Sequence, residues 1–300
     1  MKFRWMQAVL FAVVAVLTAP QLSSQLVQLS TIVNERAVAD SFNASAQDKD
    51  KDRDKEKHKE GRRHYDESEF TEKDEFRQSY PLTPGATVKV SGINGAVEVE
   101  TGSGSTAEVY IVRSARNRAD LEHRKVIVEH TGSSLVVRGE NDREKRYSRE
   151  ENPQVRQRVT LRLPRQIDFT ASGINGKTTV GEVDGPVRVS GINGKVEVAQ
   201  AVGYSELSGI NGSVIITISQ LGERGLRVSG INGAVELRFA DALNADLKVS
   251  GINGAVQADI PNVSVQGTVS RSSFNARIGA GGAPINVSGI NGRVRLSPRS

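Results

Sequence analysis

From about residue 80 onward, apolar and polar residues alternate in short runs that glycines separate. Four segments share one frame: VKVSGINGAVEVE at 88–100, VRVSGINGKVEVA at 187–199, LRVSGINGAVELR at 226–238 and LKVSGINGAVQAD at 247–259. Alternation with a period of two places every second side chain on the same face of a β-strand. Each frame therefore predicts a short strand, a corner flanked by glycines, and a second short strand.

The pentapeptide SGING forms the corner and occurs seven times without change. An eighth, degraded copy reads SSFNA and contains Phe274 and Asn275. From Asn175 onward, successive asparagines are separated by 18, 18, 21, 21, 22 and 16 residues. Repeats of this length are typical of proteins in which one small unit packs on the next. The predicted structural corner consists of Ile93, Asn94, Gly95, Ile174, Asn175, Gly176, Ile192, Asn193, Gly194, Ile210, Asn211, Gly212, Ile231, Asn232, Gly233, Ile252, Asn253, Gly254, Ile290, Asn291 and Gly292.

Two all-β architectures fit this pattern. The first is a right-handed β-solenoid, in which each unit of 18 to 22 residues is one coil and identical residues stack from coil to coil. The second is a meander of hairpins with Asn-Gly as the turn, in which Val189 would face Val198 and Ser190 would face Glu197. The isoleucine of the motif favours the solenoid, because a hairpin turn requires only Asn-Gly. In a stack, the isoleucines would form a buried column and the asparagines an amide ladder.

Residues 101–167 interrupt the repeats. They contain candidate strands at 107–112, 125–129, 134–138 and 155–163, and a candidate short helix at 118–124. This β-rich block is expected to be a cap or an insertion, since the open end of a stack exposes unpaired backbone. At the other end, the last repeat finishes in RVRLSPRS, where its charges and Pro298 are expected to blunt the final edge.

Two segments precede the repeat domain at 80–300. Residues 1–30 begin with Lys2 and Arg4 and continue as an apolar run over 6–19, which is typical of a signal peptide or, if uncleaved, an N-terminal anchor. Residues 31–79 include a stretch of alternating acids and bases with few apolar residues. Such a segment cannot form a core and predicts a disordered charged linker.

Composition excludes several classes of chemistry. There is no cysteine, so disulfides and thiolate sites are excluded, and only four histidines are present. No phosphate-binding loop, nucleophile elbow or zinc-binding helix motif occurs. We therefore predict no catalytic residue, no cofactor and no metal site. The formal net charge of +5 is small for 300 residues and does not indicate nucleic-acid binding.

One charge pattern follows the repeats. The residue two positions before the SGING serine is basic in four copies: Lys89, Arg188, Arg227 and Lys248. The residue three positions after the second glycine is acidic in three copies: Glu98, Glu197 and Glu236. Alternation turns both sets outward, and in a solenoid each set is expected to stack in a column. These columns either protect the surface against aggregation or, for the basic column, form a stripe that binds an anionic ligand.

The SGING repeats after an export-type segment, with the lead-in YPLTPGATVKVSGINGAVEVE at 80–100, resemble the bacterial putative adhesin family of GIN-type repeat domains. The resemblance covers about 80–300 and implies an exported, all-β, non-catalytic protein. The family supplies no catalytic residues. The sequence lacks an obvious C-terminal outer-membrane barrel of the kind that an autotransporter-type adhesin uses.

Together these features predict an exported, non-enzymatic, adhesin-like protein with a structural or surface-binding role in the bacterial envelope. It would reside in the periplasm, at the cell surface or outside the cell. Its expected partners are an anionic glycan, an envelope polymer or another cell-surface protein, with membrane contact only through an uncleaved N-terminal segment. The alternatives are a self-assembling envelope scaffold, which implies self-association, and a β-helix enzyme that acts on polysaccharides. The enzyme needs a cluster of distinct acids and bases that this uniform repeat does not offer.

Overall fold

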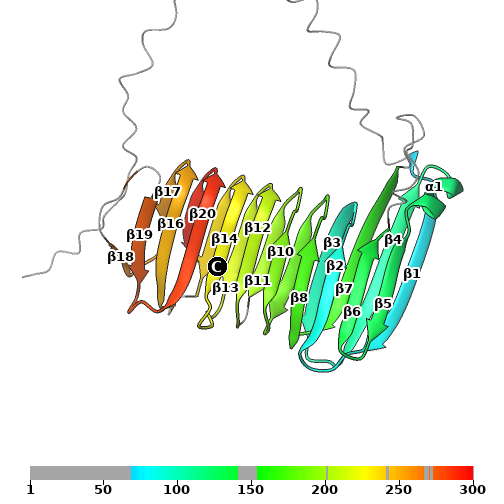
Figure 1. Cartoon of the computed structure of the whole chain (residues 1–300), viewed down its shortest axis with the longest axis horizontal. Coiled ribbons are helices and arrows are strands. Elements are labelled where there is room, and N and C mark those ends of the chain that lie inside the picture. The colour runs from blue at the N-terminus through cyan, green and yellow to red at the C-terminus, as the bar shows by residue number, and fades with distance from the viewer. Residues whose placement is uncertain are drawn as a thin grey trace, which may run out of the picture. The chain divides into compact units, whose positions relative to one another are not determined.

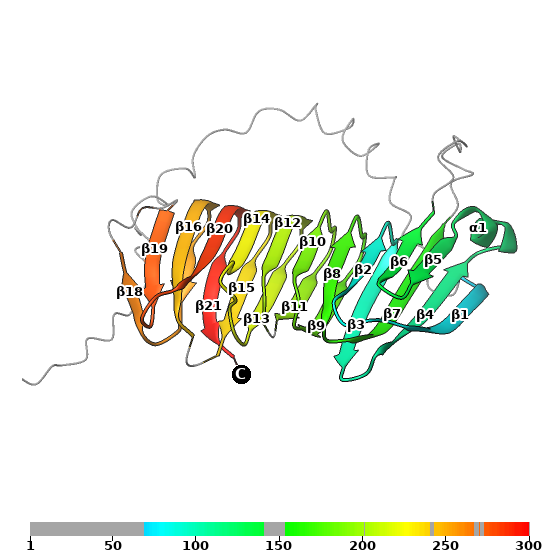
Figure 2. The ribbon, with the colours of Figure 1, turned by 60° about the horizontal axis from the view of Figure 1, so that its bottom comes forward.

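The computed structural model describes residues 69–140, 154–200, 202–240, 243–266, 270 and 273–299. The predicted signal or anchor at 1–30, and the part of the predicted linker before residue 69, lie outside these residues. The described chain is all-β apart from one short helix, and its strands form two large mixed sheets (Figures 1 and 2). No described helix is long and apolar enough to cross a membrane.

Sheet A contains ten of the described strands. In spatial order they are β1 (Glu72–Pro81), β4 (Thr106–Ala115), β7 (Val155–Pro164), β3 (Gly95–Gly102), β9 (Thr178–Val183), β11 (Val196–Gln200), β13 (Val214–Ile218), β15 (Val235–Phe239), β21 (Val294–Pro298) and β17 (Val256–Ala258).

Sheet B contains eleven of the described strands. In spatial order they are β18 (Val263–Val265), β19 (Ser273–Ile278), β16 (Ala245–Asn253), β20 (Ala283–Asn291), β14 (Leu226–Asn232), β12 (Ser205–Asn211), β10 (Val187–Ser190), β8 (Ile167–Ser172), β2 (Ala86–Ser91), β6 (Ser134–Gly139) and β5 (Val126–Thr131).

Each SGING repeat gives one strand to each sheet. In the repeat around Asn193, β10 lies in sheet B between β8 and β12, and β11 lies in sheet A between β9 and β13. All four pairings are parallel. Val189 is paired with Ala171 and Leu207, and not with Val198. The hairpin prediction is therefore wrong, because the Asn-Gly corner carries the chain from one sheet into the other.

The core lies between the two sheets and consists of columns of equivalent residues. In most strands of the repeats, the alternating valines and leucines point inward and are almost fully buried. The isoleucines of the seven corners close one side of this core. Ile210 stacks between neighbouring corners, in register with Ile231, and is 1% exposed. The predicted isoleucine column is therefore present, with the members Ile93, Ile174, Ile192, Ile210, Ile231, Ile290 and Ile252 in spatial order.

The two glycines of each corner have different roles. Gly191, the first glycine, has a φ of +62°, in the left-handed region that side chains rarely adopt. Gly194, the second glycine, packs against the backbone of the corner below it. A Cβ placed on Gly194 would lie 2.3 Å from the carbonyl oxygen of Gly176. The first glycine therefore allows the turn, and the second allows adjacent corners to approach each other.

The block at 101–167 contains the predicted elements and adds one unit to the stack. β6 and β7 pair in parallel with β2 and β3, as the strands of an SGING repeat would. Gly139 packs on Gly92 as the glycines of adjacent corners do, but the sequence after Gly139 does not continue with Ile-Asn-Gly. Beyond this unit the pairing is antiparallel. In sheet A, β4 pairs with β7 and β1 pairs with β4, and in sheet B, β5 pairs with β6. Helix α1 (Arg118–His123) follows β4.

Two assignments differ from the sequence prediction. Residues 72–79, assigned to the charged linker, belong to β1, which pairs with β4 over its whole length. An edge strand can be polar on both faces, because its stability comes from backbone pairing with one neighbour. The degraded copy at Phe274 and Asn275 is not a corner, because both residues lie inside β19, which pairs antiparallel with β16.

The order of the repeats in space also differs from their order in the chain. The last repeat, which contributes β20 and β21, lies between the two preceding repeats and not at the end of the stack. The expectation that Pro298 blunts the final edge is therefore wrong. The far end of sheet B is instead formed by β18 and β19, and that of sheet A by β17.

Candidate functional site

The outer surface of the repeats carries three rows of polar side chains, and the asparagines of the corners form the first. The amide of Asn193 donates to Oδ1 of Asn175 at 3.0 Å and accepts from Nδ2 of Asn211 at 3.2 Å. All seven asparagines continue this ladder in one direction. In spatial order they are Asn94, Asn175, Asn193, Asn211, Asn232, Asn291 and Asn253.

The ladder ends where the motif ends. No described asparagine continues the ladder beyond Asn94, whose Nδ2 donates to the carbonyl oxygen of Val155 at 3.0 Å. Its backbone N–H donates to the side-chain oxygen of Gln157 at 2.9 Å. Val155 thus satisfies the side-chain amide at the end of the row, and Gln157 satisfies the backbone N–H of the same residue. The asparagines are structural groups, because each is engaged with its neighbours.

Replacing Asn193 with aspartate is expected to destabilise the protein by about 1–2 kcal/mol at pH 7. A carboxylate can accept from Asn211 but cannot donate to Asn175, so two acceptor oxygens would face each other. Urea denaturation followed by circular dichroism measures the change. The destabilisation should shrink as the pH falls below about 4, since a protonated carboxyl group can donate.

Asn286→Asp is the matched control, because Asn286 lies outside the ladder between two basic residues. It is expected to change the stability by less than about 0.5 kcal/mol. Equal losses of stability in the two variants would show that the hydrogen bonds of the ladder do not stabilise the protein.

The second row contains the four predicted stripe residues on the outer face of sheet B. They share one row but are not direct neighbours, because each is separated from the next by one strand. Thr170 lies between Lys89 and Arg188. Glu206 lies between Arg188 and Arg227, and Asn286 lies between Arg227 and Lys248. The bases therefore recur at about 9.6 Å, twice the strand spacing, and the expected uninterrupted column is not formed.

None of these four bases takes part in an ion pair among the described residues. The serine of each motif forms an adjacent row along the same face, with Ser190 in register with Ser172 and Ser208. The outer face of sheet B thus presents hydroxyl groups beside regularly spaced cations without ionic partners.

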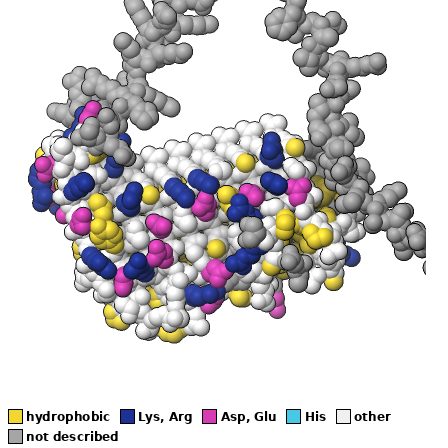
Figure 3. Space-filling model, turned by 180° about the vertical axis from the view of Figure 1, so that it is seen from behind, with side chains coloured by type: hydrophobic (Ala, Val, Ile, Leu, Met, Phe, Trp, Pro, Cys, Tyr) yellow, Lys and Arg dark blue, Asp and Glu magenta, His cyan; other side chains and the backbone are white. Residues whose placement is uncertain are grey.

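On the outer face of sheet A, two of the three predicted acids have basic partners, whereas Glu98 forms no ion pair among the described residues. Glu197 lies 2.5 Å from the ammonium of Lys195 and 3.2 Å from that of Lys177. Glu236 accepts from Arg238 at 3.1 Å and from Ser297 at 3.2 Å. On this face, seen from behind in Figure 3, basic and acidic side chains are interleaved and do not gather by sign.

These partners change the acidity of the two carboxyl groups. A hydrogen bond from Lys195 lowers the pKa of Glu197, and a hydrogen bond from Arg238 lowers the pKa of Glu236. A lowered carboxyl pKa stabilises the folded state above the ordinary glutamate pKa, and this contribution is lost on acidification. The charges of Glu197 and Glu236 therefore stabilise the fold, whereas the four bases of the second row form no ion pair among the described residues.

Sequence reasoning missed a third row, which follows the second glycine of the motif and borders the asparagine ladder on sheet A. It contains Lys177 and Lys195, with Arg158 at one end and Arg293 near the other. The signal was present, since a base follows the second glycine in three of the seven copies. Alanine or serine occupies the other copies, so the row is interrupted.

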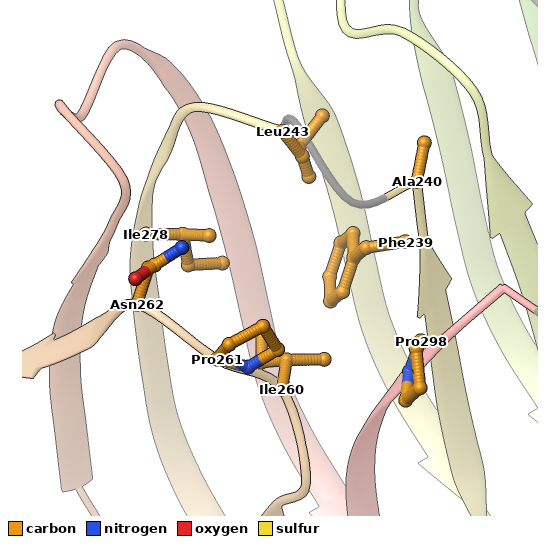
Figure 4. A pocket seen from close by; sticks show the side chains of 8 residues that line it. All are labelled: Phe239, Ala240, Leu243, Ile260, Pro261, Asn262, Ile278 and Pro298. Carbon is orange, nitrogen blue, oxygen red and sulfur yellow. The ribbon is translucent and has the colours of Figure 1, made fainter.

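The described residues form concave sites of different sizes. A polar hollow beside the first corner has a volume of about 400 Å³ and is lined by side chains that include Arg138 and Gln157. A cavity near the C-terminal end of the core has a volume of about 20 Å³ and is lined mainly by apolar side chains, including Phe239, Leu243 and Ile278 (Figure 4). A space of this size accommodates about one water molecule. The described residues contain no group of three or more His, Asp or Glu side chains that could hold a metal ion. The rows of polar side chains on the outer surface of the repeats are therefore taken as the candidate site, and the hollow lies at one end of the asparagine ladder.

Comparisons with known proteins give only distant similarities. No family model matches the chain, and no curated protein matches it. A putative cell adhesion protein from Clostridium sporogenes is 12% identical with a TM-score of 0.34, covering 75% of this chain and 100% of that one. A putative adhesin from Parabacteroides merdae is 12% identical with a TM-score of 0.24, covering 75% and 96%.

A putative lipid binding protein from Parabacteroides distasonis is 9% identical with a TM-score of 0.20, covering 76% of this chain and 97% of that one. Similarity at these values carries no argument about function.

Proposed function

We propose that this chain is an exported, non-catalytic, adhesin-like module that binds an extended anionic polymer of the cell envelope along the outer face of sheet B. The repeats act as coils of a β-solenoid, since each gives one strand to each sheet and pairs in register with its neighbours. We take the coils to be right-handed, because crossovers between parallel strands of one sheet are almost always so.

The observation that supports this function is the spacing of Lys89, Arg188, Arg227 and Lys248. These four cations have no ionic partner among the described residues and recur at every second strand along one row. A linear polymer with regularly spaced carboxylates or sulfates can lie along such a row and contact each cation in turn. The serine hydroxyls beside the row can hydrogen-bond sugar hydroxyls. Many weak contacts of one kind along a rigid surface give useful binding through multivalency.

Reversing three of these charges, in the variant R188E/R227E/K248E, is expected to weaken binding to a sulfated or carboxylated polysaccharide by about tenfold or more. Each exposed ionic contact contributes up to about 1 kcal/mol, and tenfold corresponds to about 1.4 kcal/mol. Binding of the full-length protein to dextran sulfate and to polygalacturonate, measured by biolayer interferometry, tests this. Binding by the parent protein should also decrease as salt is added.

R118E/R158E/R293E is the matched control, because it changes the net charge equally at exposed bases outside the row. This variant should retain most of the binding. If both triple variants lose binding equally, attraction is set by net charge alone and the row is not the binding surface. If the parent protein binds neither polymer, the proposed ligand class is wrong.

The export proposal has its own test. Cell fractionation with an antibody against the protein should find it in the periplasm, the outer membrane or the medium. A cytosolic location would contradict the proposed envelope role whatever the outcome of the polymer experiments.

A further inference from the structure

The last repeat, residues 283–298, is inserted between two repeats that are consecutive in the chain. β20 pairs with β14 on one side and with β16 on the other. β21 likewise pairs with β15 and β17. Figure 1 shows β20, in red, between the yellow β14 and the orange β16. The chain therefore forms the repeat at 226–239, then the outer repeat at 245–258, and last the repeat that lies between these two. We call the position between the first two repeats the slot.

The two repeats that border the slot carry equivalent residues in the same register, both with each other and with the inserted repeat. Ser288 is in register with both Ser229 and Ser250. The isoleucines and asparagines of the three repeats are aligned in the same way. If the last repeat were absent, β14 and β16 could pair directly with every row preserved. The pairing pattern alone therefore does not fix which repeat occupies the slot.

The connection into the insert is a short glycine-rich loop at 279–282. It leads from β19, on one side of β16, to β20, on the other side. Gly279 and Gly281 have φ values of +58° and +80°. Ala280 N–H donates to Oδ1 of Asn244 at 2.8 Å. β19 can stay paired with β16 while this loop opens and β20 leaves, so the loop has the position of a hinge.

We propose that the last repeat is exchangeable and that a second copy of this chain is its partner. The slot between the repeats at 226–239 and 245–258 accepts residues 283–298 of another molecule in the register shown here. Exchange of an identical element keeps every native contact and requires a change only at the hinge. It links copies of the chain through their C-terminal ends. This inference does not depend on the proposed polymer binding.

The absence of cysteine allows a direct test with full-length protein. The single variants S229C and S288C are mixed, unfolded together in urea, refolded at high concentration and oxidised. Directly paired residues of adjacent strands lie within the distance that a disulfide can bridge. Exchange predicts a covalent dimer that joins positions 229 and 288 of different chains. Non-reducing electrophoresis and peptide mass spectrometry identify this product.

The matched control mixes S172C with S288C. Ser172 belongs to the same serine row but lies on β8, which is not adjacent to β20. This mixture should give only a background level of dimer. The double variant S229C/S288C should close within one chain when dilute, which shows that the substituted protein folds with the insert in place. If it closes in this way while S229C and S288C give no more dimer than the control, exchange does not occur and the proposal is overturned.

Discussion

Replacing Gly194 with alanine is expected to destabilise the protein by about 3 kcal/mol, the largest effect that we predict for a single methyl group. The added Cβ would lie 2.3 Å from the carbonyl oxygen of Gly176 and 2.7 Å from its carbonyl carbon. Both atoms belong to the backbone of the neighbouring corner and cannot move without breaking the pairing of two strands. Overpacking of this kind costs from 1 to 3 kcal/mol or more. Urea denaturation followed by circular dichroism measures the loss of stability in the Gly194→Ala variant.

Two other glycines provide the controls for this prediction. Gly102→Ala should change the stability by less than about 0.5 kcal/mol, because its Cβ would meet no atom within 4 Å. Gly191→Ala should cost about 1 kcal/mol, since the nearest backbone atom is 3.5 Å away and the strain comes from its positive φ. If G194A is no less stable than G102A, adjacent corners are not packed as described.

Replacing Ile210 with alanine is expected to destabilise the protein by about 2–5 kcal/mol. Ile210 lies in the middle of the isoleucine column, is 1% exposed, and contributes to the part of the core that the corners close. Its neighbours above and below belong to paired strands, which limits collapse into the cavity left by the missing carbons. The same denaturation experiment measures the loss.

Ile215→Ala is the matched control, because Ile215 is an isoleucine on the half-buried outer face of sheet A, five residues further along the chain. It should cost less than about 1 kcal/mol, since an outward side chain buries less apolar area than a core side chain. Ile210→Val should destabilise the protein by an intermediate amount, about 0.5–1.5 kcal/mol. Equal losses for I210A and I215A would contradict the stacking of the corners.

Much of the candidate surface was visible in the sequence. Alternation around the SGING motif identified which residues face outward, and the recurrence of Lys89, Arg188, Arg227 and Lys248 placed them on one row. Thr170 and Glu206 separate the bases because their repeats lie between the basic repeats in the chain. Asn286 is different, because only the insertion of the last repeat brings it between Arg227 and Lys248.

The sequence by itself determined the repeating unit, its two strands and the stacking of equivalent corner residues. These features depend on local alternation, on glycine conformation and on one motif that recurs without change. Only the tertiary structure decided the order of the units, including the insertion of residues 283–298 and the use of β6 and β7 as an eighth unit. The physical reason is that identical motifs pair equally well in any order. The order is therefore set by the connections and the ends of the stack, which the motif does not encode.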